Sequence, residues 1–147
     1  MNIERERAAH ALHTIEQLPT DVKNYTSYVK ALPASILQNG LGQAMATLLA
    51  ASKGEPAMKD GNVNEAHRLL YNHLQAWLCR NDPAAPYPSQ KEPRAESTEL
   101  MGRITQEDEP NYIHAQAEAL AYLGWLKKFA TAFRPEKKEM PNEKSTP

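Results

Sequence analysis

The fold of this chain is decided by residues 31–54, ALPASILQNGLGQAMATLLAASKG, the least charged and most regularly apolar part of the sequence. Apolar side chains recur there at helical spacing: Leu37, Leu41, Met45 and Leu48, with Ile36, Ala44 and Ala51 widening the stripe. A stripe of this width is typical of a helix that is buried along most of its length. The segment is therefore predicted to be the central helix of the core.

The ends of this central helix are predicted from proline and glycine. Pro33 lacks an N–H and has a fixed φ that suits the first position of a helix, so the helix is expected to start there. Gly54 and Pro56 are expected to end it. Asn39 and Gly40 leave a second possibility open, in which the stretch is divided into two shorter helices.

Length and composition restrict the class of protein. The chain has 147 residues and a formal net charge of -1, which fits one domain with a core of its own and predicts neither nucleic-acid nor membrane binding from bulk charge. The single cysteine, Cys79, cannot form an internal disulfide and is typical of a reduced cytoplasmic protein. The start MNIERERAAH is too charged for a signal peptide, and no apolar run approaches the ~20 residues of a membrane span. We therefore expect a cytoplasmic protein without a membrane segment.

Five further segments have a helical period of apolar residues, and none alternates as a strand would. They cover residues 2–18, 20–32, 62–80, 96–104 and 110–133. Thr20 or Asp21 is the expected cap of the second helix, and Asn62 or Asn64 that of the fourth. The inward faces are expected to include Ile3 on the first helix and Phe133 on the last, whereas Arg7 is expected to point outward. The sequence thus predicts an all-α fold, a compact single-domain bundle of about six helices.

Two segments lack helical periodicity. Residues 81–93, NDPAAPYPSQKEP, contain four prolines, so an exposed and partly extended loop is expected. This loop is predicted to lie within one domain of residues 1–133, because either half alone would have too few helices. Residues 134–147 are predicted to be a disordered tail.

Side chains that could perform catalysis or bind a metal are sparse. Glu6, His10 and His13 have a spacing that could chelate a metal from one helix face, but the sequence has no HExxH motif. It also has no GxSxG motif, and its closely spaced glycines, Gly40 and Gly42, do not form a phosphate-binding loop. We therefore expect no catalytic residues, no metal site and no cofactor.

Basic side chains on helix faces and ends are the remaining candidates. Lys23 and Lys30 would lie on one face of the second helix about 10 Å apart, a spacing comparable with that of phosphates along a nucleic-acid backbone. Lys53 closes the central helix, and Lys127 and Lys128 lie near the end of the last one. Such lysines are also typical of ordinary solvated helix faces. If they contact nucleic acid, they would position the phosphate backbone without reading bases, and binding would weaken steeply with salt.

Two stretches resemble a known family. They are YxxYVKxLPxxILQNGL at residues 25–41 and LGWLKKFA at residues 123–130. In combination they are similar to the small-subunit family of type III-B CRISPR effector complexes, the fifth Cmr component, and the order and spacing of the helices match over roughly residues 5–133. The loop at 81–93 and the residues after 133 depart from the family pattern, so nothing is transferred to them.

The resemblance implies a compact helical protein without catalytic residues of its own. Copies of such a subunit stack into a short filament with a related part of the large subunit, beside RAMP-type backbone subunits that hold the guide RNA and cleave the target RNA. Base pairing with the guide supplies sequence recognition, so this subunit needs only shape and phosphate contacts. Guide RNA and target RNA are thus expected partners, in antiviral defence. The lysines expected to face RNA are Lys30 and Lys127, then Lys23, Lys53 and Lys128.

Two other classes of function stay open. A helical protein–protein adaptor with no nucleic-acid role could bind a peptide in a groove between helices, with Trp77 or Trp125 as an anchor. An enzyme could hold a metal at Glu6, His10 and His13. Co-purification with small RNA and helical partners would favour the CRISPR assignment, a lone protein partner would favour the adaptor, and metal analysis addresses the enzyme.

Overall fold

The computed structural model describes residues 2–52 and 65–136, and these residues form six helices and no β-strand. The helices are α1 (Ile3–Glu16), α2 (Tyr25–Asn39), α3 (Leu41–Ala51), α4 (Ala66–Leu78), α5 (Glu99–Gln106) and α6 (Glu109–Phe133). The predicted all-α bundle is confirmed for this part of the chain. The predicted disorder of residues 134–147 falls mainly outside it and stays a prediction.

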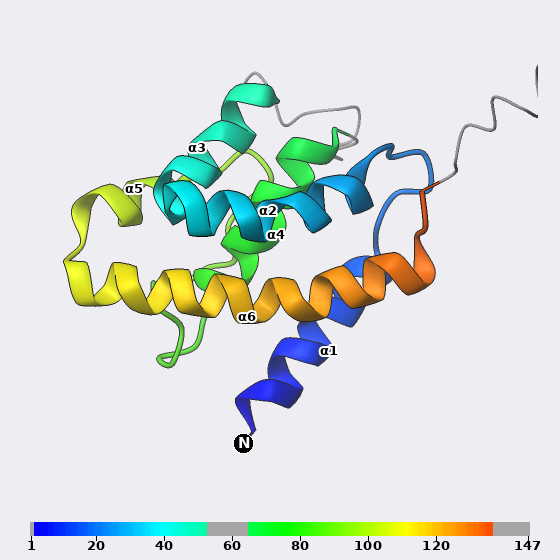
Figure 1. The fold of residues 1–147 in the computed structure, drawn as a ribbon. Helices are drawn as coiled ribbons and strands as arrows, with labels where there is room; N and C mark the ends of the chain where they lie inside the picture. The colour runs from blue at the N-terminus through cyan, green and yellow to red at the C-terminus, as the bar shows by residue number, and fades with distance from the viewer. Residues whose placement is uncertain (1, 53–64, 137–147) are drawn as a thin grey trace, which may run out of the picture.

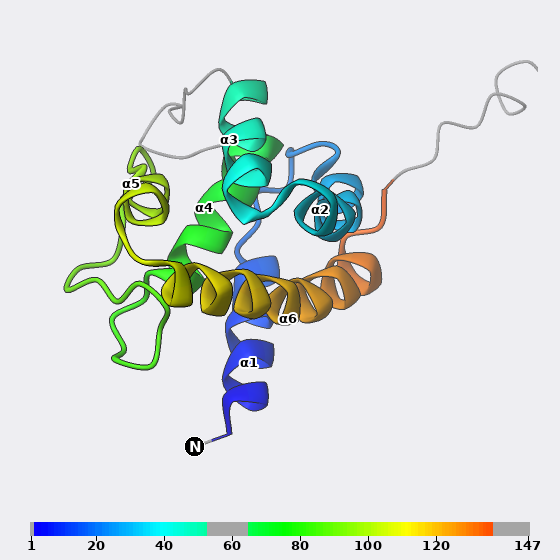
Figure 2. The same cartoon turned by 60° about the vertical axis from the view of Figure 1, so that its left-hand side comes forward.

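Helix α6 runs the full width of the bundle, and the other helices are arranged around it (Figure 1). α1 crosses α6 and projects beyond it, whereas α2 lies along the opposite flank (Figures 1 and 2). α2 and the start of α3 run antiparallel to α6, as three hydrogen bonds show: Thr26 Oγ1 to the Arg134 carbonyl, the Leu41 amide to Gln116 Oε1, and the Gly42 amide to Tyr112 Oη. α4 packs against α2, α3 and α6 from within the bundle.

The central segment is divided at Gly40, so the predicted helix start at Pro33 is wrong. Pro33 lies inside α2, where it has no backbone N–H to donate to the preceding turn. Burial of one side of the helix keeps α2 continuous at this point, through Val29, Leu32 and Ile36. Gly40 has φ 89° and ψ 158°, a conformation that is essentially confined to glycine. Its amide donates to the Ile36 carbonyl (2.7 Å) and its carbonyl accepts from the Ala44 amide (3.0 Å), so Gly40 ends α2 and begins α3.

Three apolar side chains that were expected in the core are exposed. Leu37 is 71% exposed, because the buried stripe of α2 passes through Ile36 and Leu37 lies about 100° further round the helix. Phe133 is 60% exposed at the end of α6, and Ile3 is partly exposed at the start of α1. A helix that ends near solvent leaves its terminal apolar residues without a neighbour to cover them.

Two helix starts differ from the prediction because other caps are used. α2 begins at Tyr25 instead of residue 20, after Asn24 adopts a left-handed conformation with φ 71°. α4 is capped by the Glu65 carboxylate, which accepts from the Arg68 amide. The predicted caps Asn62 and Asn64 lie outside the described residues, as do the predicted stops Gly54 and Pro56.

The proline-rich loop and the segment after it are anchored to α4, so the prediction of a wholly exposed loop is wrong. Tyr87 of this loop is fully buried. The buried guanidinium of Arg68 donates to the carbonyls of Ala95 (3.0 Å) and Ser97 (2.8 Å). The carbonyls of Ala95 and Ser97 bind Arg68, so these residues lie outside the helix. Helix α5 starts at Glu99, later than the predicted residue 96.

Gly40 provides a direct test of the helix break. We expect Gly40→Ala to lower the free energy of unfolding by about 1–3 kcal/mol, because alanine is strained at a positive φ. The added Cβ would also lie 3.0 Å from Tyr112 Oη, which accepts from the Gly42 amide. Gly124→Ala is the control: no atom lies within 4 Å of its Cβ, so α6 should be unchanged or up to about 1 kcal/mol more stable. Equal effects in urea denaturation would show that Gly40 is not required for the break.

Candidate nucleic-acid interface

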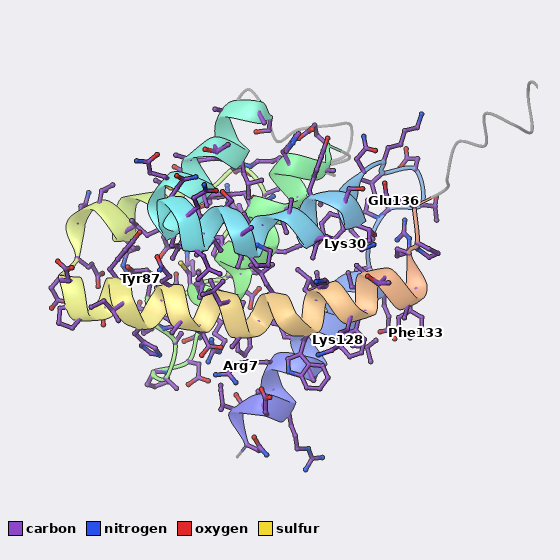
Figure 3. All side chains as sticks on the ribbon, viewed as in Figure 1. Arg7, Lys30, Tyr87, Lys128, Phe133 and Glu136 are labelled. Carbon is purple, nitrogen blue, oxygen red and sulfur yellow. The ribbon has the colours of Figure 1, made fainter. Side chains whose placement is uncertain are left out.

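The five lysines singled out by the sequence are not all brought together. Lys30 lies exposed on α2, and Lys127 and Lys128 lie exposed on α6. Figure 3 places Lys30 and Lys128 on different sides of α6. Lys53 lies outside the described residues.

Lys30 and Lys127 flank the contact between α2 and α6. Lys30 is one turn after Thr26, whose hydroxyl donates to the Arg134 carbonyl at the end of α6 (2.6 Å). Lys127 lies about three turns after Gln116, on the side of α6 from which Gln116 accepts the first amide of α3 (2.9 Å). We name the surface over this contact the α2–α6 seam, and four exposed side chains define it: Lys30 and Leu37 of α2, and Ile113 and Lys127 of α6.

The helices of the α2–α6 seam carry almost no free negative charge. α2 and α3 contain no Asp or Glu. The carboxylates of α6 are Glu109 in its first turn and Glu118, which is buried and paired with Arg7. Lys30 and Lys127 therefore face no acidic side chain of α2 or α3, although Glu136, which follows α6, accepts from Ser27 of α2 (3.3 Å).

Lys23 and Lys128 have different surroundings from those predicted. Lys23 precedes the first residue of α2, so the predicted two-turn spacing with Lys30 on one helix face is wrong. Lys128 Nζ lies 5.9 Å from the ring centroid of Trp125. Because Trp125 donates to Glu4 of α1 (3.3 Å), Lys128 belongs to the α1 side of α6. The structure thus separates Lys128 from the α2–α6 seam.

A second cluster of charged groups holds α1, α4 and α6 together. The Glu118 carboxylate is 7% exposed and accepts from Arg7 Nε (2.6 Å), Arg7 Nη2 (2.9 Å) and Trp77 Nε1 (2.9 Å). Burial opposes ionisation of Glu118, but the hydrogen bonds from Arg7 and Trp77 outweigh it and hold the pKa below the usual value. Arg7, which the sequence pattern placed outward, is therefore turned toward α6.

His10 belongs to this cluster and not to a metal site. Its Nδ1 lies 2.7 Å from Tyr122 Oη, and its ring packs edge-on against Trp77. Burial lowers the pKa of His10 to about 4, aided by the charge of Arg80. His13, three residues further along α1, is exposed. In residues 2–52 and 65–136, no group of three histidine, cysteine or acidic side chains is arranged to hold a metal ion, so the chelating group considered from the sequence is not formed.

Comparison with the profiles of known protein families identifies the family of this chain. The family profile described as "CRISPR-associated protein (Cas_Cmr5)" matches residues 3–133. This chain belongs to the Cmr5 family. Cmr5 proteins are the small subunits of type III-B CRISPR complexes, so the resemblance seen in the sequence is confirmed at the level of the family.

The Cmr5 match begins and ends with the helical bundle. It spans all six described helices, from Ile3 of α1 to Phe133 of α6. None of these helices is both long enough and apolar enough to cross a bilayer. Membership of the family implies that the protein works as one component of a multi-subunit complex.

Two features of this Cmr5 protein were not predicted from the sequence. The first is the Arg7–Glu118 pair, which joins residues 111 positions apart and leaves no local pattern. The second is a row of aromatic side chains on α6, Trp125, Phe129 and Phe133, which are stacked in sequence. Their spacing of four residues was visible, but Phe133 alone of the three was assigned to the buried stripe and Trp125 was considered as a peptide anchor.

Buried histidines predict how stability depends on pH. The pKa of His10 is lowered to about 4 and that of His73, bonded to Tyr25 Oη (2.6 Å), to about 3, both mainly by burial. Below about pH 6.5 the unfolded chain takes up two protons that the fold excludes, so stability is complete above that pH and is lost as the pH falls. We expect the free energy of unfolding to decrease by about 3 kcal/mol from about pH 6.5 to about pH 5.

Chemical denaturation across this pH range checks the expectation. His73→Gln should reduce the slope of stability against pH by about half, because one of two titrating groups is removed. The slope is the relevant quantity, since the substitution also changes absolute stability. An unchanged slope would contradict the assignment of His73 as a neutral buried histidine.

Proposed function

We propose that this Cmr5-family protein is a non-catalytic structural subunit of a type III-B RNA-guided RNA-targeting complex, acting in the cytoplasm in antiviral defence. Copies would stack into a small-subunit filament beside the RAMP-type backbone subunits and the large subunit. The filament would contact guide RNA and target RNA through the α2–α6 seam. The observation that carries this proposal is the seam itself, in which Lys30 and Lys127 project from helices with almost no free carboxylates.

The seam suits a partner that is recognised by shape and charge. Lysine contacts to phosphates position a nucleic acid without selecting a sequence. A guide–target duplex needs no more than this, because base pairing carries the sequence information and the paired region is close to A-form. Two lysines per copy give weak binding, and several stacked copies would add their contacts. The isolated chain is accordingly expected to bind RNA feebly.

The proposal that the subunit is not an enzyme rests on how its reactive groups are used. Glu118 is occupied by Arg7 and Trp77, and His10 by Tyr122. Burial raises the pKa of the Cys79 thiol to about 12, so it is protonated at neutral pH and a poor nucleophile. These groups contribute to packing, and we assign target cleavage to the backbone subunits.

One of the two tryptophans considered as peptide anchors in the adaptor hypothesis is not accessible. Trp77 is 2% exposed and stacks on Tyr122 inside the bundle, so it cannot receive a peptide. Trp125 is partly exposed on the α1 side of α6. A protein-docking role therefore remains compatible with the structure, on a surface other than the α2–α6 seam.

Reversal of the seam charges tests the proposed RNA contact. We expect Lys30→Glu with Lys127→Glu to weaken capture of target RNA by the reconstituted complex at least about tenfold at moderate salt, because two phosphate contacts per copy become repulsive. The dependence of log K on log salt should also become shallower, by about one for each lost contact. Filter binding over a salt series measures both quantities.

The control variant is Lys91→Glu with Arg94→Glu. Both residues are exposed in and beside the proline-rich loop, and the pair changes the net charge by the same amount as the seam variant. RNA capture and melting temperature should stay close to wild type. Equal loss of capture in the two variants would mean that overall charge, and not the seam, determines binding.

A further inference from the structure

A row of aromatic rings follows α6 on the side that faces α1. Trp125, Phe129 and Phe133 are spaced by four residues, with ring centroids 5.7 Å and 6.2 Å apart. Phe133 is exposed, and Figure 3 shows it on the side of α6 away from Lys30. We name this row the aromatic ladder. Trp125 and Phe129 are half-buried against the core, so the ladder runs from the core surface to an exposed ring at Phe133.

The aromatic ladder leads into an open apolar groove. The groove has a volume of about 570 Å³ and lies between α1, the chain that follows it and the end of α6. Its lining includes Leu12, Ile15, Leu18 and Phe133. A groove of this size can receive bulky aliphatic or aromatic side chains from another molecule.

The charges beside the ladder and groove differ from those of the α2–α6 seam. Glu16 is exposed and lines the groove. Glu4 lies at the other end of the ladder, and hydrogen bonds from Trp125 and Arg7 lower its pKa, so it is ionised at neutral pH. The guanidinium of Arg134, which also lines the groove, donates to the carbonyls of Leu18 and Pro19. Glu16 therefore presents a free carboxylate at the groove, whereas Glu4 is paired with Arg7 (2.8 Å) and Lys128 lies beside Trp125.

These features favour a protein over a nucleic acid. Phosphates in the groove would be repelled by the exposed carboxylate of Glu16. Insertion of a base between two ladder rings would require a distance of about 7 Å between the rings, twice the spacing of stacked bases. The ring centroids are closer together than that, at 5.7 Å and 6.2 Å. Aliphatic side chains need no such gap, because they can pack on the edges of the rings and in the groove.

We propose that the aromatic ladder and its groove bind an amphipathic helix of another protein subunit. The bound helix would place large aliphatic side chains against Phe133 and Leu12 and a lysine or arginine beside Glu16. This is the helix-in-groove mode of recognition, in which apolar anchors supply affinity and flanking charges set orientation. The inference rests on the proposed function, because it assigns the surface by which the subunit is held in its complex.

Assembly of variants with their partner subunits tests the inference. The chain is co-expressed with the large subunit and the backbone subunits of the type III-B complex, and the amount retained on the affinity-tagged large subunit is quantified. Phe133→Asp should lower retention at least about tenfold, as expected for an apolar anchor. Glu16→Lys should lower it by a smaller factor, about threefold, through repulsion of the basic flank.

Gln90→Asp is the control. Gln90 is exposed in the proline-rich loop, outside both the α2–α6 seam and the aromatic ladder, and the substitution adds the same charge as Phe133→Asp. Gln90→Asp should be retained like wild type, and both variants should melt within a few degrees of it.

Three results would overturn the inference. Equal retention of Phe133→Asp and wild type would exclude the ladder while leaving the proposed function intact. Failure of the wild-type chain to join the complex would reject the proposed function as well. If the isolated chain dimerises in sedimentation experiments and Phe133→Asp makes it monomeric, the occupant is a second copy and not another subunit.

Discussion

The arrangement of this protein depends on one buried carboxylate at the point where α1, α4 and α6 meet. Glu118 of α6 accepts two hydrogen bonds from Arg7 of α1 and one from Trp77 of α4, whose ring also stacks on Tyr122. Loss of one partner from such a pair leaves an uncompensated charge in the interior, at a cost of about 3–5 kcal/mol. Because the donors come from two different helices, this contact fixes where α1 crosses α6.

The fixed crossing gives α6 two flanks with different chemistry. On one flank, α2 lies antiparallel to α6, and the α2–α6 seam presents Lys30 and Lys127 beside exposed aliphatic side chains. On the other flank, α1 leaves the aromatic ladder and its groove open, with the free carboxylate of Glu16 at the groove. In the proposed function, one flank would contact RNA and the other would hold a neighbouring protein. The near-zero net charge of the chain conceals this division.

Much of the fold could be predicted from the sequence, because amphipathic helices leave a period of apolar residues. The family resemblance was carried by residues 25–41 and 123–130, which form α2, the start of α3 and the middle of α6. The division at Gly40 was one of two possibilities left open by the sequence, and the other, a helix start at Pro33, is wrong although proline is a strong local signal. Arg7 and Phe133 were misplaced because burial at the ends of α1 and α6 depends on which helix crosses them. Lys30 and Lys127 could be selected from the sequence, but their shared seam required the antiparallel pairing of α2 and α6.

The division of α6 into two binding flanks is the central claim, and hydroxyl-radical footprinting of the assembled complex, with and without target RNA, tests it most directly. The exposed side chains of Leu37 and Ile113 report on the α2–α6 seam, and that of Phe133 reports on the aromatic ladder. Phe133 should become protected on assembly whether or not target RNA is present. Leu37 and Ile113 should gain further protection only when target RNA is added. RNA-dependent protection of Phe133, together with RNA-independent labelling of Leu37 and Ile113, would contradict the assignment of the two flanks.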